Sequence, residues 1–276
     1  MKPYPAAKIR NVALVGHGGS GKTSLAEAML FQAGAVTRQG RVEEGNTTSD
    51  FDPDEQKRVI SINTSVLPLE WNGHKINLLD TPGYADFAGE VKEALRVADG
   101  AVIVVDGVNG VEVGTDLVTE YADERKLARM YVINRLDREH ADFERVMSQL
   151  EERNSKATAL LVPIGQEHDF QGVVDLLGQR AYTFTQGKPS ETAIPAALAD
   201  AVAARREKLV DALAEVDDAL LEKYLEGAEL TEEELTGALA TGTRQGSIVP
   251  VVWAAGVPAI GIQPLLDAIV ATMPSP

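Results

Sequence analysis

A glycine-rich segment near the N-terminus contains the residue types that wrap a phosphate chain. The run Gly16-His17-Gly18-Gly19-Ser20-Gly21-Lys22-Thr23 matches the pattern G-x-x-x-x-G-K-[ST] and is followed by Ser24. Glycine lets backbone N–H groups approach an anion closely, and the N-terminus of a following helix faces the same anion. We expect Lys22 to contact the β- and γ-phosphates and the Thr23 hydroxyl to ligate Mg²⁺. Residues 16–24 therefore predict a nucleoside triphosphate site.

A second motif follows the apolar run 76–79. Asp80-Thr81-Pro82-Gly83 has the spacing D-x-x-G. An Asp at the end of a buried strand can hold Mg²⁺ through a water molecule, and the Gly83 N–H would then reach the γ-phosphate. D-x-x-G is a weak signal by itself, but its position behind the glycine-rich segment strengthens it. We expect Asp80 and Gly83 to complete the phosphate and metal contacts.

A third motif, Asn134-Arg135-Leu136-Asp137, carries information about the base and follows the apolar run 130–133. Guanine presents two hydrogen-bond donors on one edge, and the Asp137 carboxylate can accept both. Adenine presents an acceptor there, and such a mismatch can reject a ligand by about 10⁴-fold. We expect Asn134 to link the base to the glycine-rich segment and Arg135 to pack along the base. The alternative is that Asp137 merely caps the next helix.

The elements that must position these motifs alternate between strand and helix. The pattern predicts an α/β fold with a mostly parallel sheet covered by helices on both faces. Asn72-Gly73 predicts a two-residue hairpin. The expected strands are 11–15, 64–71, 74–79, 101–106, 130–133 and 248–253, and the expected helices are 23–32, 87–98, 114–125, 142–152 and 262–273.

The stretch 157–247 has a different texture. It predicts short strands at 173–177 and 180–184, a long acidic helical run at 195–225, and a helix that starts at the capping box of Thr231 and Glu234. The acidic run fits either a solvated helix face or a surface that binds a partner.

Composition excludes several classes of protein. The 276 residues carry a formal net charge of −16 and contain no cysteine, so disulfide scaffolds, thiolate zinc sites and cysteine nucleophiles are excluded. The negative charge argues against a chain that coats nucleic acid by charge alone, and we expect no direct sequence-specific nucleic acid binding by this chain. Because no apolar run reaches the length of a membrane span or a signal peptide, we expect no membrane association and a cytoplasmic location. We also expect a monomer.

Together with several further stretches, the three motifs resemble the GTP-binding region of bacterial elongation factor G, and most closely that of its elongation-factor-G-like paralogues. The supporting stretches are residues 45–54, 55–62, 80–87, 220–225 and 261–276. The resemblance implies a P-loop GTPase fold with a G domain, 1–156 and 248–276, and an inserted α+β subdomain, 157–247, which in that family is called G′ and contacts the ribosomal stalk protein. It also implies that the chain is part of a five-domain, translocase-like protein.

The sequence departs from that family in two segments that bear on hydrolysis. The family's R-G-I-T, whose threonine ligates Mg²⁺, is Arg58-Val59-Ile60-Ser61, so the metal role falls to Ser61. Tyr84 occupies the position at which the family has a histidine that positions the attacking water. A phenol is a poor proton carrier at neutral pH. We hypothesise that Tyr84 lies outside the site until a partner docks, and that the isolated chain hydrolyses GTP slowly.

Two further departures concern ligand contacts. Gly19 stands where the family has an Asp with a cation-related role, and Ala255-Gly256 stand where it has the Ser-Ala pair whose backbone meets the guanine oxygen. The resemblance assigns catalytic roles to Lys22, Ser61, Gly83 and Tyr84, metal ligation to Thr23, Ser61 and, through water, Asp80, and guanine binding to Asn134, Arg135, Asp137, Ala255 and Gly256.

Three functions follow from these observations. The first is a Mg²⁺-dependent GTPase switch of a translation factor, in which GTP orders residues 38–62 and 80–90 and the ribosome is the partner. The second is a binding module loaded with GTP or GDP that hydrolyses little, which Val59 and Tyr84 motivate. The third is a P-loop kinase or ATPase, for which ATP would compete with GTP.

Overall fold

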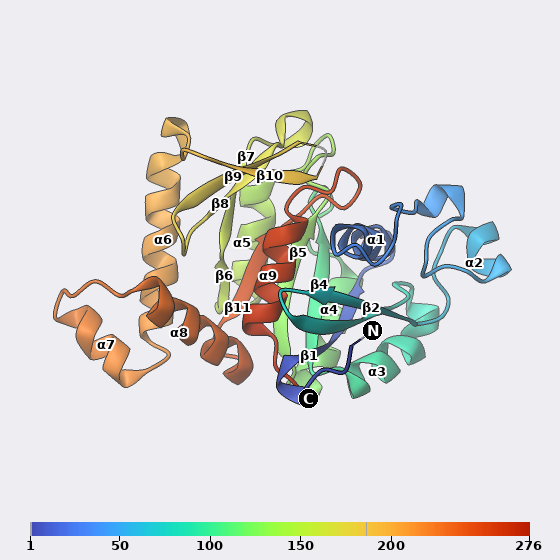
Figure 1. Ribbon diagram of the computed structural model, residues 1–276, viewed down its shortest axis with the longest axis horizontal. Helices are drawn as coiled ribbons and strands as arrows, with labels where there is room; N and C mark the ends of the chain where they lie inside the picture. The colour runs from blue at the N-terminus through green and yellow to red at the C-terminus, as the bar shows by residue number, and fades with distance from the viewer. Residues whose placement is uncertain (1, 186) are drawn as a thin grey trace.

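A computed structural model describes residues 2–185 and 187–276 as an α/β fold around a seven-stranded sheet (Figure 1). The strand order is β2-β3-β1-β4-β5-β11-β6, and every neighbouring pair is parallel except the β2–β3 hairpin. The bounds are β1 Ile9–Gly16, β2 Ser65–Trp71, β3 His74–Asp80, β4 Gly100–Asp106, β5 Ala128–Asn134, β6 Ala157–Ala159 and β11 Val249–Trp253.

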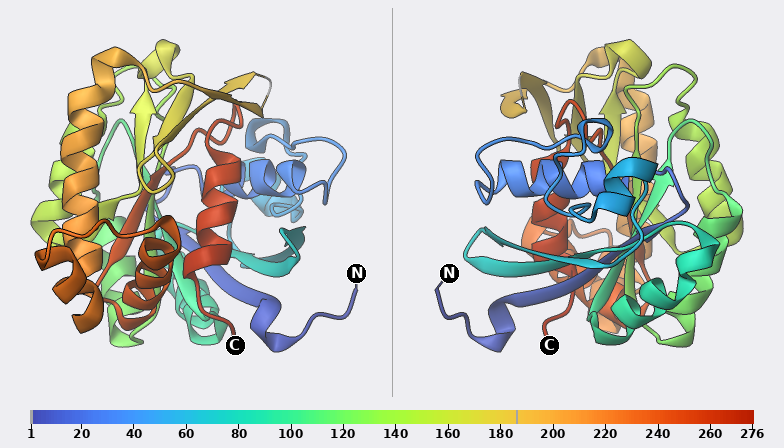
Figure 2. Two further views of the ribbon diagram at one scale, coloured as in Figure 1. Left: turned by 60° about the vertical axis from the view of Figure 1, so that its left-hand side comes forward. Right: turned by 90° about the vertical axis from the view of Figure 1, so that its right-hand side faces the viewer.

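Helices cover both faces of this sheet (Figure 2). Helices α1 and α9 contact each other on one face, and α8 packs beside α9; α3 and α4 contact each other on the opposite face. The helix bounds are α1 Lys22–Gln32, α2 Pro53–Arg58, α3 Ala88–Val97, α4 Val113–Glu124, α5 Phe143–Arg153, α6 Ala199–Ala214, α7 Asp218–Leu225, α8 Glu232–Gln245 and α9 Ile262–Thr272. Two covered faces require apolar side chains on both sides of a central strand, and all seven residues of β4 are buried.

A second, four-stranded antiparallel sheet stands beside the first (Figure 2). Its order is β10-β9-β8-β7, with bounds β7 Leu161–Ile164, β8 Gly172–Asp175, β9 Arg180–Thr185 and β10 Lys188–Thr192. Strand β10 lies at an edge, and all five of its residues are exposed.

The strands and helices expected around the three motifs are all present, with ends that differ by one or two residues. The helical run expected over 195–225 is wrong as one element, because α6 ends at Ala214 and α7 starts at Asp218. The side chain of Asp217 accepts hydrogen bonds from the Ala219 and Leu220 N–H groups, so a new helix starts there. The Thr231–Glu234 capping box does start α8.

The expected boundary of the inserted subdomain at residue 157 needs correction. Strand β6 pairs with β11 as the last strand of the central sheet, and α8 packs against β5, β11 and α9. The indole of Trp253 on β11 packs edge-on against Phe143 and donates to the Leu161 carbonyl. Residues 157–159 and α8 therefore belong to the layers of the central sheet, and one continuous hydrophobic core includes both sheets.

Across residues 2–185 and 187–276, no helix combines the length and the apolarity needed to cross a membrane.

Deleting residues 157–247 is expected to unfold the protein, because it removes β6 and α8 and exposes β11 and α9. The measurement is thermal unfolding followed by circular dichroism, in which the deletion variant should lose the cooperative transition. The matched control deletes 217–228, which contain α7; no residue of α7 is buried, so its transition should remain. A soluble 157–247 deletion variant with unchanged nucleotide affinity would show that the insert is separable.

Candidate nucleotide-binding site

The carboxyl ends of neighbouring strands meet at one edge of the central sheet, and the three motifs lie there. Gly16 ends β1, Asp80 ends β3 and Asn134 ends β5. Loops beyond the carboxyl ends of parallel strands are where α/β sheets bind ligands. The topology therefore brings together three motifs that are far apart in the sequence.

The glycine-rich loop between β1 and α1 leaves no room for side chains at key positions. Gly21 has a φ of +87°, and a Cβ on it would lie 2.5 Å from the Asn134 Nδ2 atom. A Cβ on Gly83 would lie 2.7 Å from the Gly18 Cα atom. The two expected phosphate-binding loops thus touch backbone to backbone, which leaves their N–H groups as the donors available to an anion.

Lys22 is the first residue of α1, and its ammonium group is buried. Its Nζ atom donates to the carbonyl oxygens of Gly16 at 2.9 Å and His17 at 3.0 Å. Burial lowers the pKa of Lys22 to about 8, although Asp80 and Asp50 raise it in part. A phosphate in the loop would supply the negative charge that stabilises this buried ammonium.

A polar cluster lies beside the lysine. The hydroxyls of Thr23 and Ser61 are 3.1 Å apart, so the segment that carries Ser61 closes on the glycine-rich loop. Asp80 is fully buried; the Ser49 hydroxyl donates to its Oδ2 atom at 2.7 Å, and its Oδ1 atom has no partner among the described residues. Burial raises the pKa of Asp80 to about 6, partly opposed by the Ser49 and Thr23 hydroxyls.

Asp50 belongs to the same cluster, and the sequence analysis did not assign it a role. It is 4% exposed, it lines a cavity of about 170 Å³ together with Lys22 and Thr23, and its Oδ1 atom also lacks a partner within the described chain. Burial raises its pKa, and the Ser61 hydroxyl opposes the shift. In the sequence, Asp50 could have been noticed only as an acidic residue that follows Thr47, Thr48 and Ser49 and precedes Phe51.

The donor set of this cluster fits Mg²⁺. Two buried carboxylates, each with an oxygen that has no partner among the described residues, stand beside two hydroxyls, and hard oxygen ligands are those that Mg²⁺ takes. Thr23, Ser61 and Asp80, with Asp50 nearby, are the residues that would hold the ion. The described residues contain no group of three or more His, Asp or Glu side chains placed to hold a metal, so the site is one in which hydroxyls and phosphates must complete the coordination.

Asn134 joins the glycine-rich loop to the loop after β11. Its Nδ2 atom donates to the Ser20 and Gly21 carbonyls at 3.1 and 3.3 Å, and its Oδ1 atom accepts from the Gly256 N–H at 3.1 Å. The expected link to the glycine-rich loop is present, and it is made by the side chain itself.

Arg135 and Asp137 lie on the turn after β5. The Arg135 guanidinium donates to the buried Asp106 carboxylate at 2.8 Å; Asp106 ends β4, and the sequence analysis did not assign it a role. Asp137 is half-buried. The alternative that Asp137 caps the next helix is wrong, because Asp142 caps α5 by accepting from the Arg145 N–H.

Ala255 and Gly256 lie beside Asn134, but their N–H groups are already used. The Ala255 N–H donates to the Ile260 carbonyl, and the Gly256 N–H donates to Asn134. A contact from either group to a guanine oxygen therefore requires one of these bonds to be exchanged.

The chain matches the elongation factor Tu GTP-binding domain family over residues 7–275. It belongs to this family. Among solved structures it is similar to the crystal structure of ttk003000868 from Thermus thermophilus, with 40% identity and a TM-score of 0.93. The match covers 98% of this chain and 41% of that one, so the chain spans less than half of the longer protein. The expectation of a GTP-binding domain of the translational GTPases is confirmed.

The position of Tyr84 in this GTP-binding domain differs from the hypothesis that it lies outside the site. Its ring packs on Gly18, where a Cβ would lie 3.1 Å from the ring, and it lines the same cavity as Lys22. It also forms a wall of a neighbouring apolar cavity of about 340 Å³ between α3 and α4. Tyr84 is 47% exposed.

Val59 directly follows α2 and has the left-handed conformation, with φ +57° and ψ +40°. A β-branched residue is strained there, where glycine is not. Valine at this position therefore restricts the backbone of the loop that carries Ser61.

The remaining expected phosphate contacts surround the loop. The His17 Nδ1 atom accepts from the Gly114 N–H at 3.2 Å, which ties the loop to α4. Ser20 is buried, and its Oγ atom has no hydrogen-bond partner within residues 2–185 and 187–276; Ser24 lines the 170 Å³ cavity. Gly19 has a φ of +85° with open space beside it.

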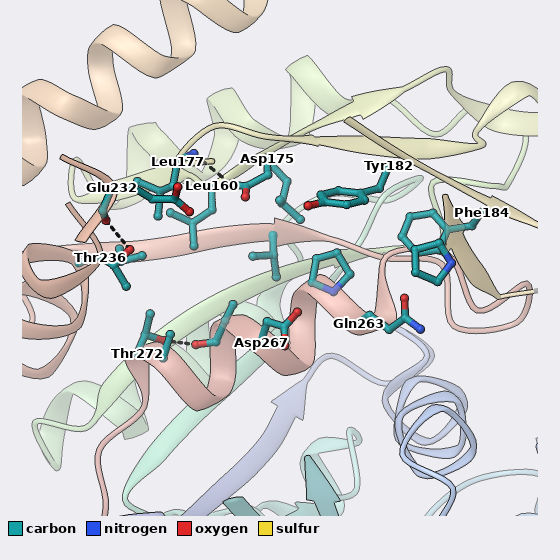
Figure 3. A pocket seen from close by; sticks show the side chains of 17 residues that line it. Leu160, Asp175, Leu177, Tyr182, Phe184, Glu232, Thr236, Gln263, Asp267 and Thr272 are labelled. Atoms are coloured by element: carbon teal, nitrogen blue, oxygen red, sulfur yellow. Dashed lines mark hydrogen bonds between the residues drawn. The ribbon is translucent and has the colours of Figure 1, made fainter. Parts of the chain in front are cut away.

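A separate cavity of about 330 Å³ lies between α8, α9 and the second sheet (Figure 3). Its walls include Leu160, Tyr182, Phe184 and Gln263, and none of the expected nucleotide-binding residues lines it. It is therefore distinct from the nucleotide site.

Replacing Asp80 by Asn is expected to stabilise the nucleotide-free protein. The pKa of Asp80 is about 6 in the folded chain against 3.8 for an ordinary Asp. Between pH 3.8 and about 6, Asp80 holds a proton in the folded chain that it has lost in the unfolded chain. The free energy of unfolding therefore falls as the pH rises through this range. At pH 7.5 the charged buried group costs about 3 kcal/mol, a cost that the neutral amide avoids.

Urea unfolding in EDTA measures this effect. D80N should be more stable than the parent protein at pH 7.5, with a smaller gain at pH 4.5, while its Mg²⁺-dependent nucleotide affinity is lost. The control D169N changes an exposed acid and should leave both quantities unchanged. A D80N variant less stable than the parent at pH 7.5 is the contrary result.

Proposed function

We propose that this domain is the GTP-binding and GTP-hydrolysing switch of an elongation-factor-G-like translation factor that acts on the ribosome. The observation that carries the proposal is the contact between Ser61 and Thr23. It joins the segment 38–62 to the glycine-rich loop at the position where a terminal phosphate and its metal would lie. The family and the 40% identity to a longer protein support the assignment.

The chemistry proposed is phosphoryl transfer to water, which depends on positioning and electrostatics. Lys22 and the N–H groups near Gly18 and Gly83 stabilise the charge on the transferring phosphoryl group. Bound Mg²⁺ would neutralise charge on the phosphate oxygens. Tyr84 would orient the attacking water through its hydroxyl, but a phenol is a poor proton carrier at neutral pH. Slow hydrolysis by the isolated domain follows from this.

Partners in the full-length protein are proposed on the same basis. The ribosome would stimulate hydrolysis, and α6 and α7 would meet the ribosomal stalk protein. Helix α7 supports this because none of its residues is buried and Leu225 is 76% exposed. We also propose a monomer acting in the cytoplasm.

A second candidate function is a guanine-nucleotide-loaded binding module with little hydrolysis. The strained Val59 and the phenol at position 84 favour it. In this case the bound nucleotide alone would set the conformation of the segment 38–62 that a partner contacts.

The base preference is expected to depend on Asp137. The parent protein should bind GDP far more tightly than ADP, by up to about 10⁴-fold, because adenine leaves the carboxylate unpaired. D137N should lose most of this preference, since the amide presents a donor to the donors of guanine. Fluorescence titration with labelled GDP and ADP measures both affinities, and E139Q, two residues away on an exposed position, is the control. Equal affinity for GDP and ADP in the parent protein would instead favour the ATPase or kinase.

Hydrolysis by the isolated domain should be far slower than the roughly 5–20 s⁻¹ of stimulated GTPases. Replacing Tyr84 by His should raise the single-turnover rate, because imidazole titrates near neutral pH, whereas Y84F should not raise it. Ribosomes added to the full-length protein should raise phosphate release. Absence of stimulation, with guanine binding intact, would favour the binding module.

A further inference from the structure

Glu27 is a buried acid on α1, five residues after Lys22, and none of the expected nucleotide contacts uses it. It is 1% exposed. Its Oε2 atom accepts from the Gly40 N–H at 2.9 Å, and its Oε1 atom accepts from the Thr48 N–H at 2.5 Å. One rigid carboxylate therefore fixes two points of the segment 38–62 to the helix that starts at the phosphate loop.

The two anchored residues control where the metal-site residues lie. Thr48 is followed by Ser49, whose hydroxyl donates to Asp80, and by Asp50, whose N–H donates to the Thr47 hydroxyl at 3.2 Å. A shift of the Thr48 backbone away from Glu27 would move both residues away from the cluster around Asp80.

Gly40 is packed tightly against the same carboxylate. A Cβ on this residue would lie 2.7 Å from the Glu27 Oε2 atom and 2.8 Å from the Thr47 Cα atom. Only glycine lets the backbone approach the acid closely enough for the hydrogen bond.

Glu55 provides a useful contrast. Its Oε1 atom accepts from the Ile62 and Asn63 N–H groups at 2.9 and 3.0 Å. Because α2, which carries Glu55, lies within the segment 38–62, these bonds fix the end of the segment to another part of the same segment. Glu27 instead connects the segment to the phosphate-loop helix.

We propose that Glu27 is a positioning residue that holds the segment 38–62 closed on the phosphate site, and thereby sets the preference for GTP over GDP. It acts through the backbone of Gly40 and Thr48 and does not touch the nucleotide. The inference rests on the proposed function, because it takes GTP and GDP as the ligands. The diphosphate needs no closed segment, so its affinity should not depend on Glu27.

The test is E27Q. Glutamine keeps the size of the side chain but has one acceptor oxygen, so its NH₂ group must face one of the two backbone donors. The affinity for a labelled, non-hydrolysable GTP analogue with Mg²⁺ should fall by about 10-fold, as for the loss of a hydrogen bond to a charged group. The affinity for labelled GDP should stay within about 2-fold, and trypsin should cleave faster at Arg38, Arg41, Lys57 and Arg58 in the analogue-bound state.

A second variant, G40A, tests the same contact without changing the charge and should give the same selective loss. The controls are E120Q, at an exposed acid on α4, and G237A, at a helical glycine with open space around it; both should keep the affinity ratio of the parent protein. Equal loss of affinity for both nucleotides in E27Q and G40A, or an unchanged ratio, would overturn the inference. A parent protein that does not prefer guanine nucleotides would overturn the proposed function instead.

Discussion

Lys22, Asp50 and Asp80 are buried charged groups at the carboxyl edge of the central sheet, and Lys22 and Asp50 line one small cavity there. The lysine donates to carbonyl oxygens, and each of the two acids keeps an oxygen without a partner among the described residues. Buried charge of this kind is costly unless it is paired. A ligand that carries both a phosphate and a cation would supply partners for these buried charges. Its binding should therefore also stabilise the folded state.

Helix α1 organises the response to that ligand. Its first turn carries Lys22 and Thr23, which line the cavity beside the glycine-rich loop, and its second carries Glu27, which accepts hydrogen bonds from the segment 38–62. The residues expected to contact phosphate and the anchor of the segment thus lie on one helix.

The parts of this fold that the sequence predicts well are those with strong local signals. Residue type and spacing specify the glycine-rich loop, the motifs at the strand ends and the hairpin, and the elements around them lie where they were expected. Strand β6 was missed because three residues carry too little periodicity.

Contacts between distant segments were harder to predict: Asp50 and Glu27 gain their roles only in the folded chain, around a cavity or through partners 13 or more residues away. The position of Tyr84 was predicted wrongly because the flat surface of Gly18 that holds its ring is not visible in a linear pattern. The roles assigned to individual site residues remain predictions.

The exposed edge strand β10 has a consequence for the behaviour of the protein at high concentration. Open strand edges invite pairing with another molecule and growth of intermolecular sheets. Pro189 removes one N–H from this strand, and Lys188 and Glu191 place charges beside it. A docking chain would meet a missing donor and two solvated charges, so this edge resists aggregation despite its full exposure.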